Sequence, residues 1–356
     1  MIEIIVSKNQ SDQRFDRFLR KYFENAPLSV ISKNIRKKNF KINDKRAKNN
    51  DFVYEGDVVK MYISDEDYNK WLTKIDFVPG DFYLDIVYED DNIIIMDKDY
   101  GELTHAASKA DYGNNLVDKM LSYLYKTRSF DMSDKTFKPA VVNRLDRNTA
   151  GLVIGAKNSK TLRSLNKAIR ENRMDKYYLT IVSGRVDQDF KIDSVISKNE
   201  NKNKVKKSKD GKEILTYFKA LETNDRYSFL ECKLITGRTH QIRYSLKENG
   251  TPILGDRKYG DRTVNKEVKD IFGINNHILL AYKLIFPEIE GLECLKDKEF
   301  LSDKYDDMIE FKEKIMSKWG KNGKSNWNWY RWNKNKCMLS RWRRQYYWKA
   351  HDGYRS

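Results

Sequence analysis

Apolar residues among the first 63 positions recur with the periods of short helices and strands. An amphipathic helix is predicted over residues 13–23, because large apolar side chains there share one helix face. These side chains belong to Phe15, Phe18, Leu19, Tyr22 and Phe23. A capping signal precedes a second predicted helix over residues 30–38. Alternation through residues 40–46 predicts a hairpin, and residues 58–63 predict another strand. The opening segment is thus expected to form a small domain.

The later chain is dominated by strand patterns. Residues 64–80 start with acidic residues and end on Pro79 and Gly80, and they are interpreted as a linker. Beyond them, helices are predicted at 116–125, after the capping residue Asn158, and at 239–247. Strands are predicted within 86–96 and at 140–142, 152–156, 177–182, 214–221 and 227–235. Many strands with few helices predict an α+β fold built on a mixed, mainly antiparallel sheet.

Charge is divided unevenly along the chain. Residues 1–63 hold 14 basic and 8 acidic residues, a net charge of +6. Residues 64–316 are nearly balanced at +1, and residues 317–356 carry +10. Basic segments at both ends of a neutral body indicate that these two segments bind RNA. The last segment also holds six of the seven tryptophans and is expected to be disordered without RNA, either as a nucleic-acid-binding tail or as an extension without a selected role.

Several classes of protein do not fit this sequence. The three cysteines and four histidines lack the spacing of metal ligands or of a disulfide framework, so no metal is expected. No apolar run approaches the ~20 residues of a membrane span, and the first residues do not resemble a signal peptide. We therefore expect a cytoplasmic protein that is not associated with a membrane. Glycine-rich nucleotide-binding motifs are not found.

Three segments carry the candidate chemistry. The first is the polar loop at 143–151, which contains Arg144 and Asp146; the others lie at 176–184 and 234–243. In order and type they resemble the three core motifs of the RluA family of RNA pseudouridine synthases. Further similarity extends from about residue 84 to residue 287.

The opening segment resembles a separate, αL-type RNA-binding module. Domain order then resembles the RluC/RluD-like branch of the family. The resemblance therefore predicts an αL-type module over 1–63, a linker over 64–80, a pseudouridine synthase catalytic domain over 81–316 and the basic tail over 317–356.

The resemblance implies which residues perform the reaction. Asp146 is expected to be the catalytic carboxylate, Tyr178 to stack on the target uracil and Arg238 to form the ion pair with Asp146. Arg243 is the second choice for that ion pair. From the residues alone, Arg238 could instead contact phosphate and Tyr178 could be a core aromatic. No cofactor is implied, because the isomerisation involves no net redox change or hydrolysis.

The expected partner is RNA, which we expect to be ribosomal RNA, and the chain is expected to act as a monomer. The predicted RNA-binding residues are Arg144, Arg14, Arg17, Arg36, Lys37, Lys38, Arg46 and Arg243. Two positions depart from the family pattern: Asn143 stands where His is usual and Ala150 where Ser is usual. The alternatives are a non-catalytic RNA-binding or ribosome-assembly protein on the same scaffold, and a glycosidase-like hydrolase, which would need a second carboxylate near Asp146.

Overall fold

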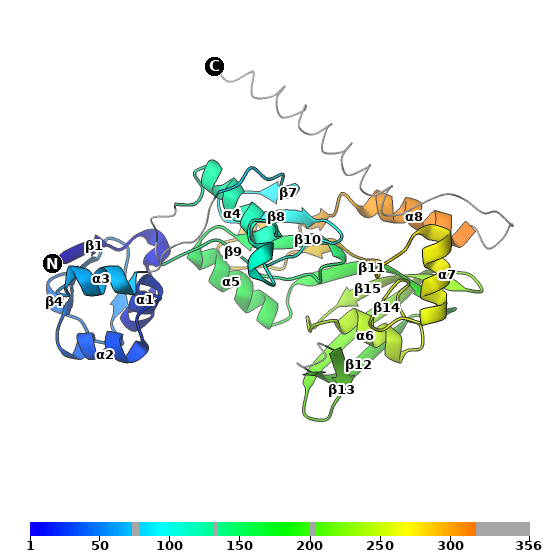
Figure 1. Cartoon of the computed structure of the whole chain (residues 1–356), viewed down its shortest axis with the longest axis horizontal. Helices are drawn as coiled ribbons and strands as arrows, with labels where there is room; N and C mark the ends of the chain where they lie inside the picture. The colour runs from blue at the N-terminus through cyan, green and yellow to red at the C-terminus, as the bar shows by residue number, and fades with distance from the viewer. Residues whose placement is uncertain (73–78, 132–133, 135, 200–203, 318–356) are drawn as a thin grey trace, which may run out of the picture.

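The computed structural model describes residues 1–72, 79–131, 134, 136–199 and 204–317. The chain begins with a small module, blue in Figure 1, followed by a larger body built on one sheet. The expected α+β class is confirmed, and the predicted tail lies outside the described residues except for Ser317. No helix in the described part of the chain combines the length and apolarity that a membrane crossing requires.

The module packs three helices around a small antiparallel sheet. Its strands follow the order β1-β6-β3-β4, and β2 pairs separately with β5. The predicted helices and hairpin are confirmed, with shifted ends. The elements are β1 (Ile2–Ile5), η1 (Lys8–Gln10), β2 (Gln13–Arg14), α1 (Phe15–Tyr22), α2 (Leu28–Arg36), β3 (Phe40–Ile42), β4 (Lys45–Arg46), β5 (Phe52–Val53), β6 (Val58–Met61) and α3 (Asp65–Trp71).

The interpretation of residues 64–80 as a linker is wrong for its first half. Ser64 caps α3 by accepting a hydrogen bond from the Asp67 amide, and three acidic residues in the first turn favour the positive end of the helix dipole. Trp71 is buried in the core of the module and packs edge-to-face on Phe23, with ring centroids 5.5 Å apart. The compact module therefore continues to about residue 72.

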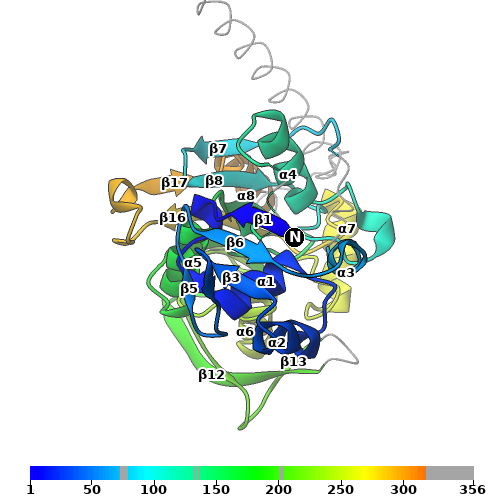
Figure 2. The ribbon, with the colours of Figure 1, turned by 90° about the vertical axis from the view of Figure 1, so that its left-hand side faces the viewer.

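The body is one 11-stranded sheet covered by helices on both faces (Figures 1 and 2). Its order is β13-β12-β14-β15-β11-β16-β10-β8-β7, with β17 on β16 and β9 on β10; the β10–β16 pair is parallel. The strands are β7 (Ile86–Glu89), β8 (Ile93–Lys98), β9 (Ala140–Val141), β10 (Thr149–Ala156), β11 (Asp175–Ser183), β12 (Phe190–Asn199), β13 (Lys204–Lys207), β14 (Lys212–Thr223), β15 (Tyr227–Leu234), β16 (Leu279–Ile285) and β17 (Glu299–Leu301).

The two faces of the sheet bury different helices. Along β10, Val153 points to a core shared with α4 and α6, whereas Leu152 and Ile154 point to a core shared with α5. A third apolar cluster holds α7 and α8 against β11, β15 and β16. The helical elements of the body are η2 (Lys109–Asp111), α4 (Leu116–Lys126), α5 (Ser159–Arg170), α6 (Gln241–Glu248), α7 (Arg262–Phe272), η3 (Glu293–Leu295) and α8 (Tyr305–Ser317).

Candidate active site

Asp146 lies in the tight loop that leads into β10, and buried neighbours fix this loop. The Thr104 hydroxyl donates to the Leu145 carbonyl at 3.0 Å, and the Asp146 carbonyl accepts from the Thr149 amide at 3.0 Å. The Lys98 ammonium, which has no exposed surface, donates to the Arg147 carbonyl at 3.1 Å. Both residues flanking Asp146 are thus tied to other segments, so its side chain starts from a fixed backbone.

The two positions that depart from the family pattern hold structural places in the same loop. The Asn143 amide donates to the Leu152 carbonyl at 3.1 Å, and its oxygen accepts from the Ile154 amide at 2.8 Å. Asn143 therefore closes the stem of the loop onto β10. Ala150 is fully buried in the cluster with α7 and α8. Neither side chain touches the Asp146 carboxylate in a hydrogen bond or ion pair among the described residues.

Arg243 on α6 pairs with two carboxylates at once. Its Nε and Nη2 donate to the two oxygens of Asp256 at 2.7 and 3.0 Å, which is a bidentate pair. Its Nη1 donates to Oδ2 of Asp146 at 2.7 Å. Asp256 is fully buried and also accepts the backbone amides of Lys258 and Tyr259. The guanidinium is therefore held in one orientation before it meets Asp146.

The predicted ion pair between Arg238 and Asp146 is wrong. Arg238 is exposed, whereas Arg243 has only 9% of its side chain exposed and supplies the ion pair. The physical reason is the start of α6: His240 adopts a left-handed conformation (φ 54°), and the helix that begins at Gln241 turns Arg243 inward. The same burial contradicts the prediction that Arg243 binds RNA, because the contacts to Asp146 and Asp256 occupy all three guanidinium nitrogens.

The surroundings of Asp146 keep its carboxylate ionised. Burial raises its pKa, but the charge that His240 carries when it is protonated, the charge of Arg243 and the hydrogen bond from Arg243 outweigh that effect and hold the pKa below its usual value. Burial lowers the pKa of His240 to about 4, so this imidazole is neutral at pH 7. At neutral pH Arg243 is therefore the cation that stabilises the carboxylate. The Asp146 side chain keeps 29% of its surface exposed, so it can meet a ligand.

Tyr178 lies next to this carboxylate. It points from β11 into the core that also contains Leu145 and Ile242, and it is 8% exposed. Burial, followed by the nearby charge of Asp146, raises the pKa of its hydroxyl. The phenol therefore stays protonated. Within the described chain, the structure thus brings together Asp146, Tyr178 and Arg243 of the predicted residues.

Other predicted residues lie on the surface. Arg144 is exposed in the loop that contains Asp146, and its charge, after burial, lowers the pKa of the His105 imidazole. The remaining predicted RNA-binding residues are exposed on the module, where Arg14 pairs with Asp16 at 2.7 Å and Arg46 donates to the Arg36 carbonyl at 3.4 Å. The exposed residues are Arg14, Arg17, Arg36, Lys37, Lys38 and Arg46.

Two buried groups belong to the site although the sequence did not single them out. Asp256 orients Arg243, and Lys98 holds the backbone after Asp146. Burial lowers the pKa of Lys98 to about 7, so its free ammonium is costly, and three carbonyl oxygens compensate it. Lysine next to a buried strand and aspartate next to a glycine are common, so residue type alone gives no signal for these roles.

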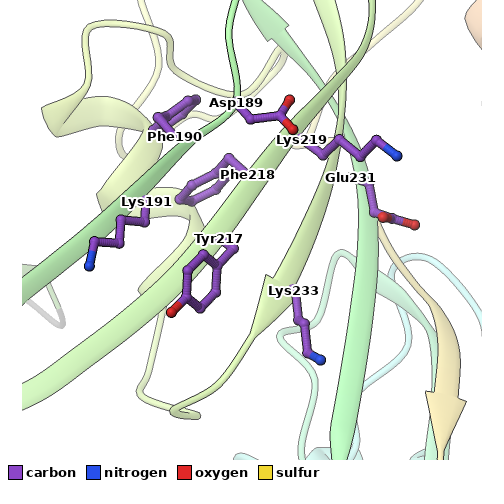
Figure 3. A pocket seen from close by; sticks show the side chains of 8 residues that line it. All are labelled: Asp189, Phe190, Lys191, Tyr217, Phe218, Lys219, Glu231 and Lys233. Carbon is purple, nitrogen blue, oxygen red and sulfur yellow. The ribbon is translucent and has the colours of Figure 1, made fainter.

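A hollow also lies on the sheet, and Figure 3 shows the side chains that line it. It has a volume of about 330 Å³ and is lined by Asp189, Phe190, Lys191, Tyr217, Phe218, Lys219, Glu231 and Lys233. Glu231 and Lys233 flank Cys232, which is paired with Tyr178 across β11 and β15. Since neighbouring residues of a strand point to opposite faces, these charged side chains lie on the face opposite Tyr178.

A group of carboxylates close enough to hold a metal ion also lies apart from the loop. It comprises Asp85, Asp97 and Asp303. The Lys304 ammonium lies 3.5 Å from Asp85 and 3.3 Å from Asp97, and thus already supplies a cation to the group. These contacts account for the acidic side chains as part of the packing between β8 and the start of α8.

The sequence of this chain is similar to those of known proteins. Residues 92–248 match the family described as RNA pseudouridylate synthase. The ribosomal large subunit pseudouridine synthase C of Buchnera aphidicola subsp. Baizongia pistaciae is 33% identical over 290 residues, which cover 79% of this chain and 88% of that protein.

Two further proteins are similar. An uncharacterized RNA pseudouridine synthase of Mycoplasma capricolum subsp. capricolum is 33% identical over 314 residues, covering 85% of this chain and 98% of that protein. The solved structure of human RNA pseudouridylate synthase domain containing 4 superposes with a TM-score of 0.48 at 21% identity, covering 61% of this chain and 87% of that chain. The identity and coverage of the Buchnera and Mycoplasma relatives show that the chain belongs to the RluA family of RNA pseudouridine synthases.

Proposed function

We propose that this enzyme converts specific uridines of large-subunit ribosomal RNA to pseudouridine, with Asp146 as the catalytic carboxylate. The observation that carries the proposal is the ionised, partly exposed carboxylate of Asp146, paired with Arg243 and adjacent to Tyr178. The ribosomal substrate is supported by the names of similar proteins, among them ribosomal large subunit pseudouridine synthases C of Buchnera and of Vibrio cholerae.

The target nucleotide has to leave its stack before Asp146 can reach the ribose, as in other enzymes that act on a nucleotide within folded nucleic acid. Tyr178 and Leu145 are buried beside Asp146 and supply an aromatic and an aliphatic surface for the flipped uracil. Arg144 is exposed at the rim of the same loop, where it can contact phosphate. These three residues fit the tasks of stacking, packing and holding the backbone.

The reaction needs one carboxylate. Asp146 either attacks C1′ of the ribose or removes the proton from C2′, and in both routes the bond between C1′ and N1 breaks with its electron pair leaving on the uracil. The base then turns, C5 bonds to C1′, and the departing C5 proton is balanced by a proton gained at N1. In the first route the ester to Asp146 is broken when C5 attacks, and in the second the proton held by Asp146 returns to C2′.

A hydrolytic reaction of the glycosidase type is not favoured by the site. Such a reaction requires a second carboxylate that can act as acid or base. Asp256 is close to Asp146 through Arg243, but it is fully buried, and its two oxygens accept hydrogen bonds from the guanidinium and two backbone amides. Asp256 therefore orients Arg243 and cannot activate water at the substrate.

The test compares two aspartate variants on unmodified, in vitro transcribed large-subunit ribosomal RNA. Asp146→Asn should abolish pseudouridine formation and leave RNA affinity within about tenfold, because phosphate contacts supply most of the affinity. Asp225→Asn is the matched control, since the Asp225 side chain is 96% exposed and forms an exposed salt bridge with Arg185. Turnover by purified Asp146→Asn above background would refute the role of Asp146. An unmodified ribosomal RNA after incubation with wild type would refute the substrate.

A further inference from the structure

Two side chains converge on the same oxygen of Asp146. Arg243 Nη1 lies 2.7 Å and His240 Nε2 lies 3.7 Å from Oδ2. No hydrogen bond or ion pair reaches Oδ1 from the described residues, although 29% of the Asp146 side chain is exposed. The two oxygens of the carboxylate are therefore not equivalent: one is held by the protein and the other is available to a ligand.

The position of His240 is fixed by its backbone and by an aromatic neighbour. His240 is the residue before α6 and has a φ of 54°, a left-handed conformation that is uncommon for a residue with a side chain. Its imidazole is only 8% exposed and packs on the edge of Tyr259, with ring centroids 5.6 Å apart. The imidazole thus has little freedom to turn away from Asp146.

Tyr259 contacts the nitrogen of His240 that does not face Asp146. The Tyr259 hydroxyl accepts from the Val205 amide of β13 at 2.9 Å and lies 3.0 Å from His240 Nδ1. The hydroxyl oxygen accepts from Val205, and its one proton is available to donate to Nδ1. In that arrangement the proton of the neutral imidazole sits on Nε2, the nitrogen that faces Asp146.

We propose that His240 is a positioning residue that directs its Nε2 toward Oδ2 of Asp146, the oxygen that Arg243 holds, and so leaves Oδ1 as the oxygen that reacts with the ribose. In this arrangement Tyr259 fixes the tautomer of His240 and ties it to the hairpin of β12 and β13. The proposal rests on the proposed role of Asp146. It assigns different tasks to the two oxygens, whereas the role of Asp146 alone does not distinguish them.

The charges around His240 favour its neutral form. Burial lowers the pKa of the imidazole, Asp146 and Asp256 raise it, and Arg243 and Lys258 lower it, with a net value of about 4. His277 also lies within reach, but its own pKa is about 3, so it is neutral as well. A protonated His240 would add a second full charge against Oδ2 and lower the basicity of the carboxylate. The proposed arrangement therefore works only with neutral His240.

The first experiment compares two substitutions of His240 on in vitro transcribed large-subunit ribosomal RNA. Gln places an amide N–H near the position of Nε2, whereas Leu fills similar space without a donor. We expect His240→Leu to lower kcat by about tenfold to a hundredfold with little change in KM, because a misplaced carboxylate slows the chemical step. His240→Gln should recover most of the loss. A kcat of His240→Leu equal to that of wild type, or equal losses in both variants, would overturn the proposal.

The second experiment uses the pH profile, which a merely structural contact would not change. Tyr259→Phe removes a hydrogen bond that stabilises the neutral imidazole, so the pKa of His240 should rise from about 4 while burial still holds it below 6.5, and the acid limb of kcat should move to higher pH. The double variant Tyr259→Phe with His240→Gln should lose that limb. The control is Tyr217→Phe, which removes an exposed hydroxyl from β14. A wild-type pH profile in Tyr259→Phe would refute the assignment of the tautomer.

Urea unfolding of each variant shows whether a lower kcat comes from a less stable fold or from a displaced Asp146 carboxylate in a stable protein. Failure of the proposed function is recognised separately, because Asp146→Asn would then retain turnover whatever the His240 variants do.

Discussion

Arg243 joins a partly exposed carboxylate to a fully buried one, so its removal affects chemistry and stability through different partners. Arg243→Ala leaves Asp256 buried without a counter-ion, and we expect the free energy of unfolding to fall by about 3 to 5 kcal/mol. Turnover should be lost with it. Arg243→Lys keeps a charge but cannot make the bidentate pair, so intermediate stability is expected.

Urea unfolding and pseudouridine formation measure both effects. Arg185→Ala is a suitable control, because Arg185 forms exposed salt bridges with Asp187 and Asp225 and its loss should cost less than about 1 kcal/mol. Wild-type stability in Arg243→Ala would contradict the described network.

Two buried histidines make stability depend on pH. The pKa of His277 is lowered to about 3 and that of His240 to about 4, both mainly by burial, from an ordinary value of 6.5. The unfolded chain therefore takes up protons at a pH where the folded chain does not. The free energy of unfolding should fall as the pH drops below 6.5, by about 1.4 kcal/mol per pH unit for each histidine.

Urea titrations between pH 5 and pH 7 measure this slope. The Thr149 hydroxyl lies 3.0 Å from Nε2 of His277, and His277→Gln keeps a polar group there while removing the titration. This variant should lose about half of the slope. The lowered pKa values of Asp146 and Asp256 act in the same direction, but only at more acidic pH, below their ordinary value of 3.8. A stability that does not change between pH 5 and pH 6.5 would show that the two imidazoles are not neutral and buried in the folded protein.

At this scale the sequence could identify the motif but not the geometry within it. Asp146 and Tyr178 could be picked out as candidate residues because the segments 143–151, 176–184 and 234–243 resemble the family motifs in order and residue type. The structure places the two residues close together. The choice between Arg238 and Arg243 depends on the left-handed backbone at His240, which no spacing rule predicts. Asp256 was inside a segment that resembles the family, but its burial and its bidentate contact arise only when α6 and the segment after it are packed together.

At the scale of elements, helices with a regular apolar stripe and strands that flank the motifs were predictable. The helix α5 begins after Asn158 as expected, with the Asn158 side chain accepting from the Thr161 amide. The helices α3, α7 and α8 and the strands β12 and β13 were not predicted. Several of these are rich in charged residues, as in the segment of α3, which contains a single buried residue, Trp71. Their stability comes from tertiary packing, which a local pattern does not contain.

The helix α5 is strongly basic, although the net charge of the body as a whole is close to zero. Four basic residues and no acidic ones occur in α5, and all four are exposed: Lys160, Arg163, Lys167 and Arg170. The pKa of Lys21 on α1 is lowered by burial and then by the charges of Arg163 and Arg17, so α1 and α5 lie close together. Positively charged side chains that lie this close together attract a polyanion such as RNA. We therefore expect α5 to contact RNA phosphates together with α1.

The double variant Arg163→Gln with Lys167→Gln tests this contact. Loss of two phosphate contacts should reduce the slope of log affinity against log salt by about 1.4 to 1.8. Turnover at saturating RNA should stay unchanged, because Arg163 and Lys167 are exposed and the described contacts of Asp146 come from His240 and Arg243. The matched control is Arg262→Gln with Lys266→Gln on α7, where Glu267 and Asp270 offset the basic residues. Equal salt slopes in the two double variants would contradict an RNA contact by α5.

At the scale of the whole molecule, the module and the body have separate apolar cores. The core of the module contains only residues up to Leu72, and those of the body begin at Leu84. The Gln10 side chain of the module donates a hydrogen bond to Asp134 of the body at 3.1 Å. Residues of both parts also line a hollow of about 370 Å³. The fold of the body should therefore not depend on the module.

Removal of residues 1–72 should leave a body that folds and still modifies a short RNA fragment. Its affinity for full-length large-subunit ribosomal RNA should fall by about tenfold or more, because the exposed arginines and lysines of α1 and α2 are lost and phosphate contacts supply most of the affinity. The boundary matters: a deletion that ends at residue 63 leaves Trp71, which packs on Phe23, without its core. The shorter deletion is therefore a poor measure of RNA binding.

Affinity and turnover measured on both RNAs distinguish recognition from chemistry. A separate variant that lacks residues 318–356 reports the contribution of the basic tail, so that the two ends of the chain are not confused. If the module recognises RNA, its loss raises KM on the long RNA and leaves kcat on the short fragment close to that of wild type. Undiminished activity of the body on the long RNA at limiting concentration would show that recognition resides in the body, with α5 as the first surface to examine.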